Sequence, residues 1–225
     1  KHKLEAQLGM SVQGINTSAH GLKYQEIPYE ELGLSGIDLG VPVPSSSVLS
    51  ESKSASYFGR VNYNLLSRYL FTATFRADGS SKFAKGNRWG YFPSAAFAWR
   101  ISDEPFLKRA KFIDDAKIRA SYGLSGNNRV GDFSYFASVS SPYEGYYSFE
   151  NETPKRGANR TSLGNRDLKW ETSIQTDLGL DLMLFKGRLN FTLDLYRRKT
   201  VDLLMNADLP AVSGFASAYK NIGSI

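Results

Sequence analysis

Apolar and polar residues alternate over residues 170–185, in the longest regular pattern of the chain. Every even position from Trp170 to Leu184 holds tryptophan, threonine, isoleucine or leucine, whereas the odd positions up to Asp181 are polar or glycine. A period of two gives a β-strand one apolar face and one polar face, and the same leucines would be scattered around a helix. The pattern therefore predicts a long β-strand.

A second run of the same kind follows over residues 188–196, after a link that consists of Lys186 and Gly187. Two alternating runs joined by two residues that include glycine predict a tight β-hairpin. Such a loop pairs Leu184 with Leu189 and places the leucines of both strands on one face. A shift of one residue would move one set of leucines to the opposite face, so the pattern also predicts the register.

Five earlier segments alternate in the same way and bring the expected number of strands to seven: residues 4–12, 57–65, 69–77, 89–101 and 118–124. In an up-and-down sheet, alternate connections lie at the same end. The connections at one end are expected to be long loops, namely 14–55, 79–88 and 125–168. The connections at the other end are short, except for a charged insert at residues 102–116. Long loops at one end and tight turns at the other are typical of outer-membrane β-barrels.

Strand length separates two all-β architectures that share this alternation. A soluble β-sandwich, acting as a binding or adhesion module, is built from strands of roughly 3–10 residues. Residues 170–185 would span about 50 Å at about 3.3 Å per residue, which favours a segment of a large antiparallel transmembrane β-barrel. The soluble sandwich and a passive porin-like channel stay open as alternatives, because both contain alternating strands.

The two faces of the expected strands carry different residue types. Tyrosine and tryptophan lie on the apolar face near strand ends, as in the aromatic girdles at the two lipid–water interfaces of a barrel. The expected lipid-interface aromatics are Tyr57, Tyr63, Tyr69, Trp89, Trp99 and Trp170. Charged and amide side chains lie on the other face, as expected for the wall of a water-filled lumen. The expected lumen-facing residues are Arg60, Asn62, Arg76, Arg100, Arg119, Asp177 and Asp181.

Composition excludes several other classes of protein. The 225 residues include no cysteine and two histidines, and they contain no nucleophile, phosphate-loop or zinc-protease motif. We therefore expect no enzyme, no cofactor and no metal site. Asp177 and Asp181 would lie about 13 Å apart on a strand, which is too far for a glycosidase pair. No apolar run is long enough for a transmembrane helix.

The formal net charge is +6, which raises the possibility of a nucleic-acid partner. The basic clusters around Lys108 and Arg198 both lie near the ends of expected strands. In a barrel such residues meet lipid headgroups or solvent. We therefore expect no nucleic-acid binding.

Several strings of residues, taken in order, are similar to the barrel of the SusC/RagA family of TonB-linked outer-membrane proteins. They are distributed over residues 56–225, and the segments 14–55 and 129–160 carry none of them. The strings are 56–63 (SYFGRVNY), 68–83 (RYLFTATFRADGSSKF), 87–94 (NRWGYFPS), 99–102 (WRIS), 117–123 (KIRASYG), 165–172 (NRDLKWET), 202–204 (DLL), 209–210 (LP) and 213–215 (SGF).

The resemblance implies a plugged barrel of about 22 strands, of which this chain would hold about one third. It also implies a bacterial outer-membrane location, contact with outer-membrane lipid, and import of an oligosaccharide or peptide in Bacteroidetes. The implied partners are a SusD-like surface lipoprotein and TonB, which acts through an N-terminal part. Neither a plug domain nor a signal peptide has a match in this sequence, so we expect an internal piece of a longer chain.

An aromatic-rich stretch lies within the expected loop 125–168. Tyr143, Tyr146, Tyr147 and Phe149 have few charged neighbours, and aromatic rings in a loop stack on sugars or pack against a partner. The simpler alternative, which we favour, is that these rings form the small core of a folded loop. Contact with substrate or partner and packing within the loop are therefore both open.

Overall fold

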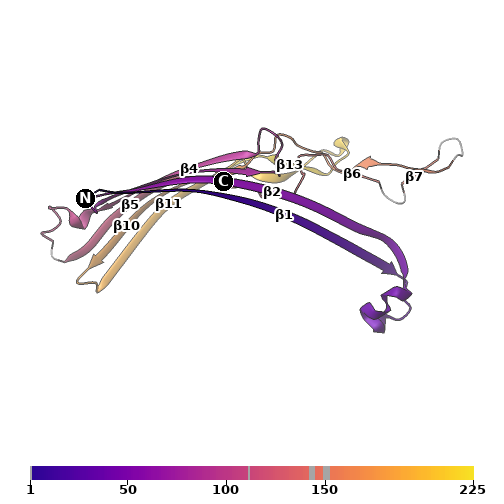
Figure 1. Ribbon diagram of the computed structural model, residues 1–225, viewed down its shortest axis with the longest axis horizontal. Helices are drawn as coiled ribbons and strands as arrows, with labels where there is room; N and C mark the ends of the chain where they lie inside the picture. Colours follow the sequence, from indigo (N-terminus) through magenta and orange to yellow (C-terminus); the bar gives the residue numbers. More distant parts are fainter. Residues whose placement is uncertain (1, 111, 142–144, 149–152) are drawn as a thin grey trace.

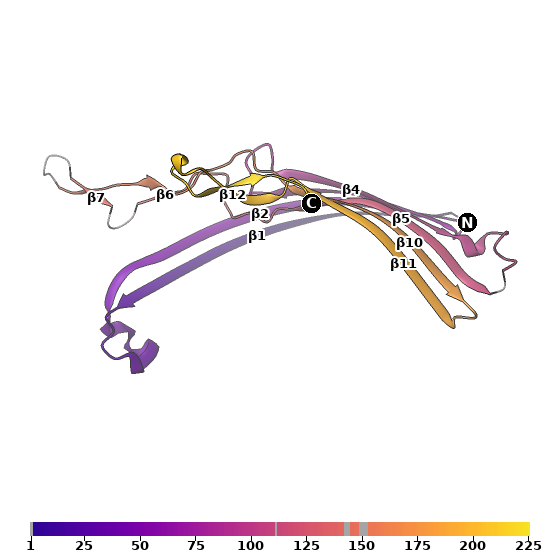
Figure 2. The same cartoon turned by 180° about the vertical axis from the view of Figure 1, so that it is seen from behind.

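The computed structural model describes residues 2–110, 112–141, 145–148 and 153–225 of the chain. Within them, seven long strands lie side by side in one curved antiparallel sheet (Figures 1 and 2). In sheet order they are β1 (His2–Gln25), β2 (Val41–Leu65), β3 (Tyr69–Ser80), β4 (Trp89–Arg100), β5 (Ile113–Asn127), β10 (Glu171–Leu184) and β11 (Leu189–Val201). Sheet order follows chain order, so the predicted up-and-down arrangement of seven strands is confirmed.

The predicted register of the last hairpin is confirmed as well. Leu184 lies opposite Leu189, and Leu178 lies opposite Leu195. The turn between them passes through left-handed backbone conformations, with φ of 57° at Lys186 and 76° at Gly187. Glycine adopts such a conformation without steric cost, which explains why this short link contains one.

The first connection is much shorter than the sequence predicted. Residues 14–55 were expected to be a loop, but β1 continues to Gln25 and β2 begins at Val41. The connection is therefore residues 26–40, and a 3₁₀ helix, η1 (Glu30–Leu39), forms most of it. The prediction was wrong because the outer halves of β1 and β2 are mostly polar on both faces, so hydrophobic alternation does not reveal them.

The other connections lie where the sequence predicted them. Residues 66–68 form a tight turn, and residues 101–112 include the 3₁₀ helix η2 (Ile101–Asp103). The connection expected as a long loop at 79–88 is the shorter loop 81–88, because β3 continues to Ser80. The expected loop 125–168 becomes residues 128–170. In its described part it contains four two-residue strands, which pair as β6 with β9 and β7 with β8: β6 (Val139–Ser140), β7 (Tyr146–Tyr147), β8 (Lys155–Arg156) and β9 (Asn159–Arg160).

A further hairpin follows β11. It consists of β12 (Leu204–Asp208), the 3₁₀ helix η3 (Ala211–Ser213) and β13 (Ser217–Asn221). The Asn221 side chain donates to the carbonyl oxygens of Lys169 and Asp202 at 2.8 and 2.9 Å and accepts from the Lys169 N–H at 2.9 Å. The two bonds to Lys169 hold the hairpin against the segment just before β10, and the bond to Asp202 ties β13 to the link between β11 and β12.

The main sheet is a single layer whose apolar face is exposed. Leu8, Tyr91 and Leu178, on three different strands, keep 89%, 60% and 55% of their surface accessible. A sandwich would bury this face against a second sheet about 10 Å away, so the sandwich alternative is wrong. No helix in the described ranges has the length and apolar character needed to cross a membrane.

The buried core lies at the end of the sheet that carries the long loops. Phe83, Val130 and Leu168 form a buried cluster, and Trp170 and Leu204 pack against it. These residues come from the connections 81–88 and 128–170 and from β12. The core cluster therefore holds the loops together, and the sheet itself has no comparable core among the described residues.

Pro93 marks the point where β4 separates from β5. The pairing of β4 with β5 covers Ser94 to Arg100 and stops next to this proline, which has no N–H to donate. The buried ring of Phe92 lies next to this point, and a Cβ added at Gly126 would lie 2.0 Å from that ring. Glycine is therefore required at this position of β5.

Candidate functional site: the charged face of the sheet

The register of the sheet places the seven predicted lumen residues on one face, opposite the exposed leucines. Arg60 of β2 lies opposite Thr74 of β3. Arg119 of β5 lies opposite Ala98 of β4 on one side and opposite Gly179 of β10 on the other. Because side chains alternate along each strand, this charged face runs across five strands from β2 to β10.

Four charged side chains on β5, β10 and β11 form one network. Arg119 donates two hydrogen bonds to the Asp181 carboxylate, at 2.9 and 3.0 Å, and another to Asp194 at 2.8 Å. The Lys117 ammonium lies 3.0 Å from Asp181. Two cations face two anions, so the network carries no net charge. The sequence prediction missed Asp194, although it occupies a polar position in the alternating run 188–196.

Gly179 makes the contact between Arg119 and Asp194 possible. The three residues form one row across β5, β10 and β11. A Cβ at Gly179 would lie 2.7 Å from both Arg119 Cζ and Asp194 Oδ1. The missing side chain therefore lets the guanidinium group reach across β10 to the next strand.

Replacing Gly179 is expected to break this contact. In Gly179→Ala the Arg119 side chain has to turn away from Asp194, and the lost ion pair between partly exposed groups lowers the free energy of unfolding slightly. Unfolding of the full-length receptor in detergent measures the change. Gly14→Ala is the control, because a Cβ at Gly14 meets no atom within 4 Å. Gly179→Ala and Asp194→Ala remove the same contact, so fully additive effects would contradict the assignment.

The predicted polar residues on β2 and β3 pair with near neighbours on the same face. Three side-chain hydrogen bonds show this: Arg60 Nε to Thr74 Oγ1 at 3.2 Å, Thr72 Oγ1 to Asn62 Oδ1 at 2.9 Å, and Arg76 Nε to Asp78 at 2.8 Å. The groups are solvated or only partly buried, so these pairs orient the side chains rather than stabilise the sheet strongly.

Asp177 and Arg100 complete the predicted set. Asp177 accepts hydrogen bonds from Ser121 at 2.9 Å and from Gln175 at 2.8 Å, so it belongs to a group separate from Asp181. Arg100 lies 3.7 Å from the Asp115 carboxylate. The whole face thus presents hydroxyl, amide and paired charged groups to solvent.

Five of the six predicted interface aromatics lie in two rows on the opposite, apolar face. Tyr57 stacks on Trp89 near the loop end, with ring centroids 6.0 Å apart. Tyr69 stacks on Trp99 near the short-turn end at 6.3 Å, and Tyr63 lies on the same face. Trp89 and Trp99 are separated by roughly 33 Å along β4. At a strand tilt of about 40° this is about 25 Å in height, which matches the apolar band of a transmembrane barrel.

Trp170 is the exception, and the prediction for it was wrong. Its ring packs against Phe83 and Phe92, with centroids 5.5 and 5.6 Å away, and its indole N–H donates to the Arg88 carbonyl at 3.0 Å. Trp170 precedes the first residue of β10. The period of two no longer decides its direction there, and the ring joins the core cluster instead.

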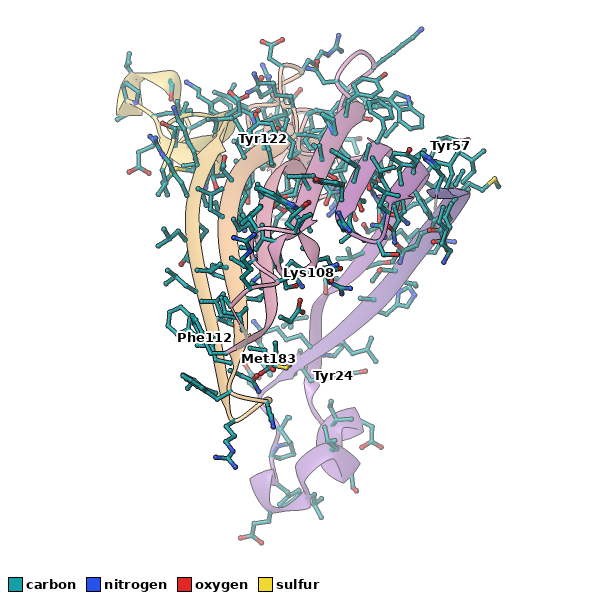
Figure 3. The ribbon with its side chains drawn as sticks, turned by 90° about the vertical axis from the view of Figure 1, so that its left-hand side faces the viewer. Tyr24, Tyr57, Lys108, Phe112, Tyr122 and Met183 are labelled. Atoms are coloured by element: carbon teal, nitrogen blue, oxygen red, sulfur yellow. The ribbon has the colours of Figure 1, made fainter. Side chains whose placement is uncertain are left out.

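The sequence reasoning also missed a buried carboxylate at the short-turn end. Glu104 accepts hydrogen bonds from the Tyr69 hydroxyl at 2.6 Å and from the Trp99 indole N–H at 3.2 Å, and Arg68 lies 3.5 Å away. The pKa of Glu104 lies below its usual value, mainly because the carboxylate accepts the hydrogen bond from Tyr69. The hydrogen bond from Trp99 and the positive charges of Arg68 and Lys108 lower this pKa further. Figure 3 shows Lys108 in the connection 101–112, between β4 and β5. The ionised carboxylate thereby fixes two girdle aromatics.

The predicted aromatic contact residues fall into two groups. Tyr146 and Tyr147 form β7, and each keeps about half of its surface exposed. Tyr143 and Phe149 lie outside the described residues. The structure therefore places these two consecutive tyrosines on a short strand of the loop 128–170, and their role in substrate or partner contact stays a prediction.

A single-layer sheet with an exposed apolar face, two aromatic rows and a charged opposite face defines a segment of an outer-membrane β-barrel. The comparison with protein families agrees, because the TonB dependent receptor-like, beta-barrel family matches residues 3–225. The chain belongs to this family, whose members are outer-membrane receptors and transporters. The resemblance to SusC/RagA proteins is thereby confirmed.

Individual relatives come from Bacteroidetes. The chain is 40% identical to TonB-dependent receptor P3 of Formosa agariphila over all of its length and 22% of that protein. It is 41% identical to TonB-dependent receptor SusC of Bacteroides thetaiotaomicron over 76% of the chain and 17% of SusC. Among solved structures, the chain is similar to the RagAB peptide importer in its closed-closed state, with 28% identity and a TM-score of 0.86. The match covers 100% of this chain and 24% of the solved chain. The chain spans less than a quarter of the length of these relatives.

Proposed function

We propose that the full-length protein imports an oligomeric nutrient, either a glycan or a peptide, through the lumen of a TonB-dependent barrel. In this proposal the charged face of the sheet lines the lumen, and the exposed leucines contact outer-membrane lipid. Segments before this one would supply the plug and the contact with TonB.

The observation that carries the proposal is that the single-layered sheet has an exposed apolar face on one side and a charged, polar face on the other. Lipid accepts an apolar band flanked by aromatic rows, and water fills a lumen lined by polar side chains. The network of Arg119, Lys117, Asp181 and Asp194 is neutral as a unit. Such a wall favours passage of polar oligomers and holds neither cations nor anions strongly.

A SusD-like lipoprotein is the proposed partner at the outer mouth. The solved relative is described as the RagAB peptide importer, and SusC is another relative. Tyr146 and Tyr147, exposed on the loop 128–170, are proposed to contact substrate or this lipoprotein. Aromatic rings suit both roles, because they stack on sugar faces and pack against protein surfaces.

Energy dependence of uptake tests the proposal. Cells that express the full-length receptor are given fluorescent oligosaccharides and oligopeptides, with and without a protonophore. We expect uptake of one class to require the receptor and to stop when the proton gradient is dissipated or TonB is deleted. Receptor-dependent uptake that persists without energy would instead indicate a passive porin-like channel.

A further inference from the structure

The hairpin of β1 and β2 extends far beyond the rest of the sheet. β3 pairs with β2 only from Ser54 to Leu65, whereas β1 pairs with β2 as far as Gln25 opposite Val41. Residues 14–25 and 41–53 therefore form a two-stranded ribbon, about 40 Å long at about 3.3 Å per residue. Figures 1 and 2 show this ribbon passing the ends of its neighbours and ending in η1.

The base of the ribbon is fixed to the neighbouring loops. The Lys53 carbonyl accepts from the Ser81 N–H at 2.9 Å, and the Lys53 N–H donates to Ser81 Oγ at 2.9 Å. Further out, Ser50 donates to Asp132 of the loop 128–170, and Lys82 lies 3.8 Å from the same carboxylate. These contacts hold the base, so the ribbon places its tip at a defined side of the mouth.

The tip, residues 26–40, combines exposed apolar side chains with negative charge. Leu34 is 86% exposed, and Tyr29, Leu32 and Leu39 are each at least half exposed. The tip sequence contains four acidic residues and no basic residue, although the whole chain carries a net charge of +6. Among the side chains that the structure describes, Glu26, Glu31 and Asp38 of the tip form no ion pair. Figure 3 shows Tyr24 where the ribbon meets the tip.

We propose that this tip docks onto the surface lipoprotein that covers the barrel mouth, with Leu34 as the central anchor. The inference rests on the proposed function, and it assigns the contact to one element of this chain. Apolar anchors surrounded by charges of one sign fit an apolar pocket with a basic rim on the partner. An anionic lipid surface would repel the acidic tip, and β3, the strand next to the ribbon in the sheet, ends about 40 Å of strand length before the tip.

Site-specific crosslinking in the intact complex tests the assignment. A photo-crosslinking residue replaces Leu34 in the full-length receptor, which is purified together with its lipoprotein. Leu66 is the matched control, because it is also an exposed leucine but lies in the tight turn at the opposite end of the sheet. We expect crosslinks to the lipoprotein from position 34 and none from position 66.

Affinity measurements complete the test. Leu34→Asp is expected to weaken lipoprotein binding at least about tenfold, whereas Leu66→Asp leaves it unchanged. The pair Glu31→Lys and Asp38→Lys is expected to slow association and to reduce its dependence on salt. Unchanged binding by Leu34→Asp, or crosslinks from position 34 to a second receptor copy or another barrel loop, would overturn the inference. Failure of the wild-type receptor to bind any lipoprotein would instead overturn the proposed function.

Discussion

Leu178→Arg in the full-length receptor is expected to lower the free energy of unfolding by about 2–4 kcal/mol. Leu178 lies in the middle of β10, on the exposed apolar face between the two aromatic rows. If hydrocarbon surrounds this face, the variant must bury a guanidinium group in lipid or distort the bilayer around it. Reversible unfolding of the receptor in lipid vesicles measures the change.

Gln175→Arg is the matched control for this substitution. Gln175 lies three residues away on the same strand, on the charged face, and its amide donates to Asp177 at 2.8 Å. An arginine there meets water and a carboxylate, so the expected change is within about 0.5 kcal/mol. Equal losses for both variants would contradict the assignment of the two faces.

Leu168→Ala is expected to lower stability by about 2–5 kcal/mol, as for other fully buried leucines. Leu168 is fully buried between Phe83 and Val130, and the substitution leaves a cavity that the packed loops fill only in part. Because the cluster joins the connections 81–88 and 128–170, the loss should be concentrated at the mouth. Hydrogen exchange should increase in residues 128–170 and stay unchanged in the middle of β3.

Val212→Ala serves as the control for the cavity. Val212 is almost fully exposed in η3, so its truncation should change stability by less than about 0.5 kcal/mol. Equal destabilisation of the strands and of the connections 81–88 and 128–170 by Leu168→Ala would contradict this account. It would show that the core cluster stabilises the whole sheet and not the loops alone.

The strands inside the apolar band could be predicted from sequence because each alternates between two environments. Leu184 and Leu189 illustrate this, since a two-residue link and two apolar sets leave one register that keeps both sets on one face. The same logic placed Arg119 and Asp181 on one face of the sheet, and it predicted the two aromatic rows on the other face, apart from Trp170. Family strings then identified the kind of barrel that contains these strands.

The features that the sequence did not predict depend on contacts that the alternation of apolar and polar residues does not show. Residues 14–25 and 41–53 form strands through backbone hydrogen bonds to each other, without an apolar face. Trp170 lies outside the regular strand, so the core cluster decides its direction. Glu104 follows a strand by four residues, and nothing in the local sequence shows that it meets Tyr69, which is 35 residues away.

The central claim is that hydrocarbon, and no layer of protein, surrounds the leucines of β10 and β11. Nitroxide labels at Leu178 and Gln175 of the full-length receptor in lipid bilayers test it most directly, through their accessibility to oxygen and to a water-soluble nickel complex. We expect the label at Leu178 to be accessible to oxygen and shielded from nickel, and the label at Gln175 to be accessible to nickel. A label at Leu178 that is shielded from both reagents would contradict the account.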